Sequence, residues 1–231
     1  MSNGQADSVQ LRYERKYYLT PPEAAALRRR VACLLQPDAH AAGAYKISSL
    51  YFDDVYDTAL HEKLSGVAVR DKWRLRWYDD RLDFIRLERK HKENELGCKT
   101  HAPVTEQQHS RLLRGDMDAA ADLPGAVGQA FRAVHYTRRL RPVVVVSYMR
   151  EAFGYEPGNV RITFDADLRA ARPGSPVSLP VSTGGLTILE LKYDNMLPAV
   201  VADMLRGAQY TQLALSKYVM ARFALMQAGY E

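Results

Sequence analysis

The stretch DKWRLRWYDD, residues 71–80, alternates strictly between charged and aromatic or apolar side chains in its middle. Successive side chains of a β-strand point to opposite faces, so the pattern predicts a strand with one basic and one aromatic face. The basic face carries Lys72, Arg74 and Arg76, and the other face carries Trp73 and Trp77. Two interpretations of the basic face remain open. It contacts bulk water, as one face of an antiparallel sheet commonly does, or it contacts an anion.

The chain has 231 residues and a net charge of +5, with 32 Lys and Arg against 27 Asp and Glu. A basic surplus favours anionic partners in general, such as nucleotides, phosphate polymers, nucleic acids or anionic lipids. The length suits one large domain or two small ones. We expect residues 1–10 to form a flexible N-terminus and residues 11–228 to form a single domain.

Cysteine content and hydrophobicity indicate the cellular location of the protein. Cys33 and Cys98 are far apart and belong to no paired motif, which argues against a disulfide framework or a zinc site. The N-terminal stretch MSNGQADSVQ has no apolar signal core. The longest apolar runs are too short to cross a bilayer as a helix. We expect a cytoplasmic protein that reaches the inner face of a membrane only through a partner.

Alternation and turn residues predict many β-strands, with helices at the start, the middle and the end of the chain. The expected strands are 11–19, 45–53, 68–78, 82–92, 143–153, 160–168 and 187–194. Helices are expected from a capping box at Thr20–Glu23, from Thr105, before Phe131, and from Pro198 to Met226 with a break near Gly207; residues 169–185 are expected to be a long loop. Because turns join most strands, the pattern favours an α+β protein with an antiparallel β-barrel and flanking helices.

Several other predicted strands also carry cations beside carboxylates or hydroxyls on one face. In a closed barrel, side chains of one parity all point inward, so these faces would form a basic interior with a few acids. Two like charges about 4 Å apart repel by roughly 4 kcal/mol at an effective dielectric near 20. Such an interior therefore needs water, carboxylates or a polyanion. A phosphate chain meets this need, because arginine binds phosphate oxygens in bidentate fashion.

Three glutamates share faces with these cations: Glu14, Glu88 and Glu190. They either pair with lysines or hold Mg2+ or Mn2+ together with phosphates. The six histidines show no ligand spacing, so we interpret them as surface or satisfied residues. The sequence contains no glycine-rich phosphate loop.

Nine short motifs occur in an order that identifies a family resemblance. They are YERKY (13–17), SLYFD (49–53), KWRLRWY (72–78), LERKHKE (87–93), GCKTH (97–101), SYMREAF (147–153), VRITFD (160–165), ILELKYD (188–194) and LSKY (215–218). In these motifs the chain resembles the VTC domain, the polyphosphate polymerase module of the vacuolar transporter chaperone complex. That domain belongs to the CYTH, or triphosphate tunnel metalloenzyme, superfamily.

The resemblance implies an antiparallel β-tunnel that transfers the γ-phosphate of ATP to a growing polyphosphate chain, with Mn2+ or Mg2+. The implied catalytic cations are Lys16, Arg74, Arg76, Lys90, Arg150, Arg161 and Lys217. Further phosphate contacts are implied for Lys99, Tyr148, Lys192 and Ser216. The implied metal ligand is Glu190, with Glu88 and Glu14 as companions.

The chain also departs from its relatives. Ala214 stands where fungal members have a lysine, and the first strand has only Glu14 and Lys16 of an ExExK pattern. The second departure argues against a typical triphosphatase with a full acidic metal rim. We expect neither the phosphate-sensing SPX domain nor the membrane helices of the eukaryotic module, because the 231 residues leave no room for them. We therefore expect a bacterial stand-alone form whose membrane channel, if one exists, is a separate chain.

Two alternatives to a polymerase remain open. One is a hydrolase of triphosphate or polyphosphate in the same tunnel, and the other is a non-catalytic subunit that binds phosphate or polyphosphate. Nucleic acid is not an expected partner, because no nucleic-acid fold motif occurs. In addition, the aromatic residues near the cations lie on the opposite strand face, where they cannot provide a stacking platform.

Overall fold

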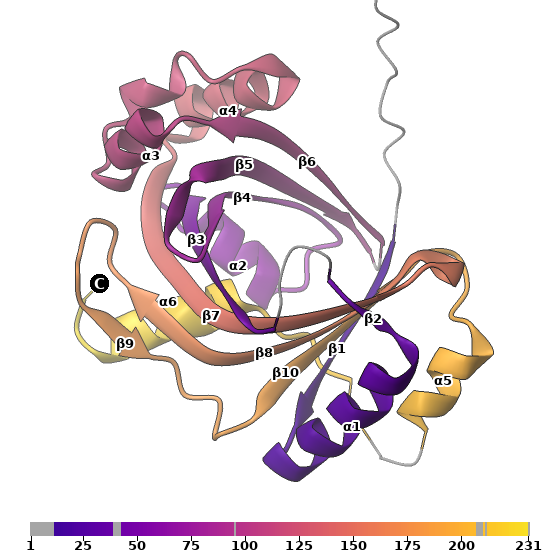
Figure 1. The fold of residues 1–231 in the computed structure, drawn as a ribbon. Helices are drawn as coiled ribbons and strands as arrows, with labels where there is room; N and C mark the ends of the chain where they lie inside the picture. Colours follow the sequence, from indigo (N-terminus) through magenta and orange to yellow (C-terminus); the bar gives the residue numbers. More distant parts are fainter. Residues whose placement is uncertain (1–11, 39–42, 95, 207–209, 211, 231) are drawn as a thin grey trace, which may run out of the picture.

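The computed structural model describes residues 12–38, 43–94, 96–206, 210 and 212–230. The flexible N-terminus that we expected over residues 1–10 lies outside these ranges. The described strands form one antiparallel sheet (Figure 1). They are β1 (Tyr13–Leu19), β2 (Gln36–Pro37), β3 (Tyr45–Asp53), β4 (Val69–Tyr78), β5 (Arg81–Glu93), β6 (Leu96–Val104), β7 (Arg141–Tyr155), β8 (Val160–Ala171), β9 (Ser178–Pro180) and β10 (Thr187–Tyr193).

The sheet curls strongly without closing into a continuous barrel. Its strand order is β1-β10-β8-β7-β3-β4-β5-β6, with β2 added beside β7 and β9 beside β8. The edge strands β1 and β6 approach each other at one end, where an isolated bridge joins Arg12 to Gly97. The antiparallel, tunnel-like α+β fold expected from the sequence is therefore confirmed, as a curled sheet whose edges meet at one bridge.

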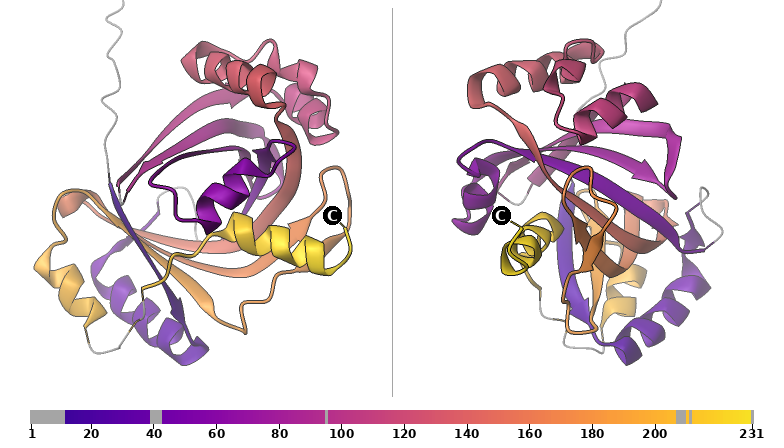
Figure 2. Two further views of the ribbon diagram at one scale, coloured as in Figure 1. Left: turned by 180° about the vertical axis from the view of Figure 1, so that it is seen from behind. Right: turned by 90° about the vertical axis from the view of Figure 1, so that its left-hand side faces the viewer.

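Helices cover the outside of the curl (Figures 1 and 2). They are α1 (Pro21–Leu34), α2 (Thr58–Leu64), α3 (Glu106–Leu113), η1 (Met117–Ala120), α4 (Gly125–Arg138), η2 (Pro157–Asn159), α5 (Ala199–Leu205) and α6 (Lys217–Gln227). Seen from behind, α2 and α6 lie across the rear of the curled sheet. No helix among the described residues is long and apolar enough to span a membrane.

The hydrophobic core consists of three clusters between the sheet and these helices. One cluster packs with α2 and α6 against the inward face of the sheet and includes Tyr51 and Tyr148. A second lies on the outer face under α3 and α4, and a third on the outer face under α1 and α5. Trp73 and Trp77 belong to the second cluster, as expected for the aromatic face of β4. Trp73 packs edge-to-face on Phe131 of α4, and Trp77 packs on His109 of α3. Since the aromatic face of β4 points outward to helices, the opposite face of this strand lines the interior.

Local signals set several element boundaries as predicted. The β4–β5 hairpin turns at Asp79 and Asp80, which both adopt positive φ, at 49° and 56°. Two such residues in a row suit the twist of a hairpin. At the start of α1, the backbone N–H of Thr20 donates to Oε2 of Glu23 at 2.7 Å, completing the expected capping box.

Other elements differ from the prediction. Residues 169–185 are only partly loop, because β8 continues to Ala171 and Ser178–Pro180 forms β9 beside it. Two elements were not predicted: α2, which has only seven residues, and β6, which contains Gly97 and Pro103. The helical region expected from Pro198 to Met226 consists of the separate helices α5 and α6. Gly207, where we placed the break, lies outside the described residues.

One histidine contradicts our interpretation of the six. His109 is 4% exposed and packs on Trp77, and neither of its ring nitrogens has a hydrogen-bond partner among the described residues. It is therefore neither a surface histidine nor a satisfied one.

Candidate functional site

Two cavities lie end to end inside the curled sheet. The smaller cavity has a volume of about 460 Å³ and is lined by inward residues of β4 from Arg70 to Arg76. The larger cavity has a volume of about 780 Å³ and is lined by inward residues of the same strand from Arg74 to Tyr78. The residues that line both are Tyr13, Glu14, Arg74, Arg76, Lys90, Arg150, Glu190 and Lys192. Because they share this middle section, we describe them as one tunnel with two mouths.

Different elements form the two mouths. The α2 mouth is lined by Lys63 of α2 and by residues 212–218, which lead into α6. The β6 mouth is lined by residues 97–103 of β6 and by residues 124–127 at the start of α4.

The structure brings most of the predicted site residues into this tunnel. Those lining the smaller cavity are Glu14, Lys16, Arg74, Arg76, Lys90, Tyr148, Arg150, Glu190, Lys192, Ser216 and Lys217. Two more, Lys99 and Arg161, line the larger cavity towards the β6 mouth. Ala214, the position at which relatives have a lysine, lines the α2 mouth.

Glu88 lines neither cavity and lies beneath the cations of the wall. Its Oε2 accepts from Nε of Arg74 at 2.7 Å, and its Oε1 accepts from Nζ of Lys99 at 2.9 Å. Burial alone would raise the pKa of Glu88, but the charges of Arg74, Arg76 and Lys99 hold it well below its usual range. Glu88 therefore stays ionised and fixes the wall cations in place.

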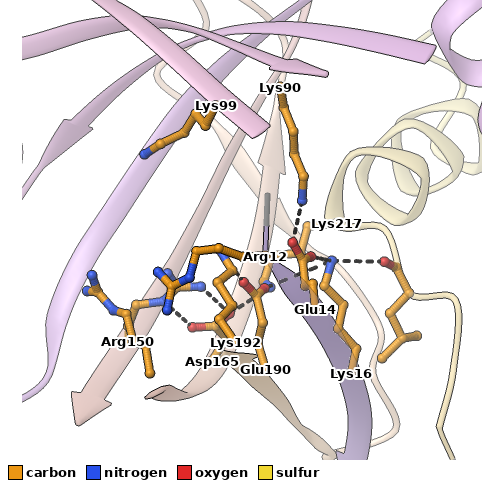
Figure 3. Close-up of polar contacts among 12 residues, drawn as sticks. Arg12, Glu14, Lys16, Lys90, Lys99, Arg150, Asp165, Glu190, Lys192 and Lys217 are labelled. Carbon is orange, nitrogen blue, oxygen red and sulfur yellow. Dashed lines mark hydrogen bonds and ion pairs between the residues drawn. The ribbon is translucent and has the colours of Figure 1, made fainter. Parts of the chain in front are cut away.

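A second buried carboxylate, Asp165 on β8, holds two further cations (Figure 3). Arg150 donates from Nε and Nη2 to its two oxygens at 2.6 and 2.7 Å. Nζ of Lys217, the first residue of α6, lies 2.6 Å from Oδ2 of the same carboxylate. Through Asp165, these hydrogen bonds and the ion pair connect the start of α6 to β7 and β8. In the sequence, Asp165 is the last residue of the VRITFD motif and was given no role.

Glu14 and Glu190 face the tunnel from neighbouring strands, among lysines (Figure 3). Nζ of Lys16 lies 2.8 Å from a Glu14 oxygen and 3.9 Å from a Glu190 oxygen. Glu14 also pairs with Lys90 at 2.7 Å, and Glu190 with Lys192 at 2.8 Å. Against the effect of burial, these lysines keep the pKa values of both glutamates well below their usual range.

For other lysines of the wall, nearby carboxylates do not fully offset the effect of burial on the pKa. Burial lowers the pKa of Lys90 and of Lys99 to about 8, although each has a glutamate partner. Lys72, which the sequence left without a role, points inward, and burial together with Lys16 and Lys90 lowers its pKa to about 6. Its Nζ donates to Oγ of Ser216, the N-cap residue of α6, at 3.1 Å.

The tunnel lining therefore has a large excess of positive charge. Among the described residues that line the two cavities, Glu14 and Glu190 are the only acids. Strands β4, β7 and β8 each contribute at least one arginine to the lining, and β5 contributes two lysines. Sequence reasoning missed the lining cations Lys63 and Arg70. Lys63 lies on a helix that was not predicted, and Arg70 lies before the quoted alternation. Such a surface binds anions.

The carboxylates set a limit on metal binding. The described residues contain no cluster of three or more His, Cys, Asp or Glu side chains that could hold a metal by themselves. Mg2+ is usually bound by one or two carboxylates together with substrate phosphates. Glu14 and Glu190 face the tunnel and fit that role. Glu88 fits it poorly, because Arg74 and Lys99 already occupy both of its oxygens.

Comparisons with known proteins agree with this geometry. The VTC domain family matches residues 11–226. No curated protein sequence matches the chain.

One solved structure supports the fold at low sequence identity, and two further matches have lower TM-scores. The PH1012 protein of Pyrococcus horikoshii has a TM-score of 0.50 and 12% identity, and the match covers 91% of this chain and 98% of that one. The PH1819 protein of the same organism gives 0.49 and 12%, covering 94% and 99%. A "putative adenylate cyclase" of Bacillus halodurans gives 0.46 and 13%, covering 96% and 91%.

Proposed function

Since the chain belongs to the VTC domain family, we propose that it is a polyphosphate polymerase that transfers the γ-phosphate of ATP to a growing polyphosphate chain and releases ADP. Family membership and the basic interior identify a tunnel protein of the polyphosphate and triphosphate class. The observation that supports the finer proposal best is the tunnel itself, whose inward cations far exceed its two lining carboxylates.

The two mouths favour a polymer as ligand. A short triphosphate needs a single opening, whereas a chain longer than the tunnel needs a way out at the other end. The middle section shared by the two cavities contains Arg74, Arg76 and Arg150, so a chain that passes through the tunnel contacts all three.

The proposed reaction needs little covalent chemistry from the protein. A terminal phosphate oxygen of the chain forms a bond to the γ-phosphorus of ATP, and the bond from that phosphorus to the bridging oxygen of ADP breaks. The attacking oxygen is already anionic, so no general base is required. Arg74, Arg76, Arg150 and Lys217 bring two anions together and stabilise charge on the transferred group, which is the main contribution of protein to phosphoryl transfer.

We propose Glu14 and Glu190 as the residues that hold Mg2+ or Mn2+ with phosphate oxygens. When bound, the metal neutralises phosphate charge and aligns the phosphates for in-line attack. Tyr148, whose hydroxyl lies 3.4 Å from Nη2 of Arg76, supports that guanidinium in the tunnel wall.

The remaining sequence-based statements stay predictions. They are a single domain over 11–228, a bacterial origin, a cytoplasmic location, and contact with a membrane only through a separate protein. ATP and polyphosphate are the proposed ligands.

An activity assay tests the proposed function. We would incubate the protein with ATP and Mn2+ or Mg2+, and measure polyphosphate on gels together with ADP. A polymerase produces long polyphosphate and one ADP for each phosphate added. Arg76→Met should lower this rate by about 10²- to 10³-fold, the usual loss when one stabilising donor is removed. Arg29→Met, on the exposed face of α1, is the matched control and should keep full activity.

Other outcomes would favour the alternatives. Orthophosphate without polymer identifies a hydrolase. Salt-sensitive binding of polyphosphate without turnover, across metals, primers and pH values, identifies a non-catalytic binding protein. Either result rejects the polymerase proposal.

A further inference from the structure

The two mouths of the tunnel differ in how their cations are compensated. At the β6 mouth each cation has a carboxylate partner. Lys99 pairs with Glu88 at 2.9 Å, Arg161 with Asp38 at 2.5 Å, and Arg12 with Asp194 at 3.1 Å. The α2 mouth contains Lys63, Arg70 and Lys72, and none of these three has an ion-pair partner among the residues that the structure describes.

Among the described residues, neutral groups hold Arg70 and Lys72, whereas Lys217 at the same mouth pairs with Asp165. Lys72 donates to Oγ of Ser216, and its Nζ lies 5.0 Å from the centre of the Tyr218 ring. Arg70 donates from Nη1 to the backbone carbonyl of Val67. Burial lowers the pKa of Lys63, and so do the nearby charges of Arg70 and Lys16. The cluster is thus close enough for mutual repulsion, which an anion would relieve.

Strand geometry connects this cluster to the centre of the tunnel. Arg70, Lys72, Arg74 and Arg76 are alternate residues of β4 and share its inward face. Alternate residues of a strand lie about 6.7 Å apart, so these four basic side chains form a row about 20 Å long. The row begins at the α2 mouth beside Lys63 and ends in the section that both cavities share. A single phosphate cannot span such a row, whereas a phosphate chain can.

We propose that Lys63, Arg70 and Lys72 form a further phosphate-binding subsite, which holds the part of a polyphosphate chain that leaves the centre of the tunnel through the α2 mouth. The proposal rests on the proposed function for the identity of its ligand. It gives the tunnel a direction, because the chain extends on the side where three basic side chains lack a carboxylate among the described residues.

Binding measurements without turnover test the subsite. Isothermal titration calorimetry with tripolyphosphate and with long-chain polyphosphate compares the wild-type protein with Lys63→Ala/Arg70→Thr. Both substitutions suit their secondary structure, a helix and a strand. The control is Arg29→Ala/Arg114→Ala, which removes the same charge from exposed positions on α1 and at the end of α3.

We expect the double variant to bind long-chain polyphosphate about tenfold more weakly, the loss expected for two partly solvated ion pairs. Its affinity for tripolyphosphate, which the central cations hold, should match that of the wild-type protein, and the control should bind both ligands as the wild-type protein does. The proposal is overturned by an unchanged affinity for the long chain, by an equal loss for both ligands, or by an equal loss in the control.

Failure of this subsite is distinguishable from failure of the proposed function. A selective loss of long-chain binding in a protein that makes no polymer from ATP supports the subsite and rejects the polymerase. A protein that makes polymer but shows no selective loss supports the polymerase and rejects the subsite.

Discussion

Asp165 shows how single residues build this site. It is almost fully buried and compensates two cations, Arg150 and Lys217, that come from different elements. Removing one member of a buried charge network costs much more than the net contribution of the network, because the remaining charges stay buried without a partner. The carboxylate therefore maintains the wall without itself lining either cavity.

Replacement of Asp165 by Asn tests this role. We expect the variant to lose about 3 kcal/mol in free energy of unfolding, because Arg150 and Lys217 lose their shared counter-charge. Urea denaturation measures the loss. Tripolyphosphate should stabilise the variant more than it stabilises the wild-type protein, since a bound anion replaces the missing charge. A variant with wild-type stability would contradict the assignment, and Asp83→Asn, at an exposed hairpin position, should leave stability unchanged.

At this scale the sequence predicted which side chains point inward but not which ones meet. The alternation in β4 was sufficient to place Arg74 and Arg76 on one face. It did not reveal that Asp165 contacts Lys217, because that contact depends on how α6 packs against β8. Lys72 had the correct parity and lacked only a family counterpart, so a stricter use of parity would have included it.

At the scale of elements, α2 and α6 are tied to the end of β3 by one buried network. The hydroxyl of Tyr218 donates to Oδ2 of Asp53 at 2.5 Å, and the same carboxylate accepts from the backbone N–H groups of Ala59 and Leu60 in α2. Burial and the charge of Asp53 raise the pKa of Tyr218, so it remains a donor. The network positions the residues at the α2 mouth.

Tyr218→Phe removes this link with little change in volume. We expect a loss of about 2 kcal/mol in free energy of unfolding, the range for a hydrogen bond to a charged group. Thermal or chemical denaturation provides the measurement. Tyr230→Phe, at a tyrosine that is 44% exposed, is the control and should behave like the wild-type protein. If both variants unfold alike, the link does not stabilise α6.

The packing of α3 on β4 makes stability depend on pH through His109. Burial lowers the pKa of this histidine below its usual 6.5. Above pH 6.5 the histidine is neutral in both the folded and the unfolded protein, so its burial does not oppose folding. As the pH falls below 6.5 towards the lowered pKa, the unfolded chain binds a proton that the folded protein does not, and stability decreases.

His109→Phe should reduce this dependence. Between pH 7 and pH 5, urea midpoints of the wild-type protein should fall more steeply than those of the variant. His61→Gln, at an exposed position of α2, should retain the wild-type slope. Parallel slopes for all three proteins would show that folding does not change the pKa of His109.

Element prediction from sequence succeeded where a pattern was long. The alternation of β4 and β5, with two aspartates between them, was enough to predict the hairpin. Helix α2, strand β6 and strand β9 were missed because they are short or interrupted by Gly and Pro, and their formation depends on neighbours that are distant in sequence. As a consequence, the sequence did not predict the α2 mouth, which Lys63 helps to line.

At the scale of the whole molecule, the curled sheet concentrates lysines whose pKa values are lowered. A bound polyanion favours their charged form and raises these pKa values again. Binding should therefore take up protons near neutral pH, and affinity should weaken as the lysines lose their protons at higher pH. Lys99, with a pKa of about 8, is the clearest case.

Proton uptake on binding tripolyphosphate can be measured by calorimetry in buffers that differ in ionisation enthalpy. At pH 8, which is near the pKa of Lys99 in the unliganded protein, Lys99 should contribute about half a proton to the uptake. Lys99→Met should lack this contribution, while titration of the ligand itself is common to both proteins. Equal uptake by the two proteins would place the bound phosphates away from Lys99.

The tunnel binds phosphates through its inward cations, and this is the central prediction for the whole molecule. The most direct test is a crystal structure of the protein with tripolyphosphate and Mg2+. We predict phosphate density in the middle section, within hydrogen-bonding distance of Arg74, Arg76 and Arg150. Phosphate found only on the outer surface, at a ligand concentration that saturates binding in solution, would contradict the account.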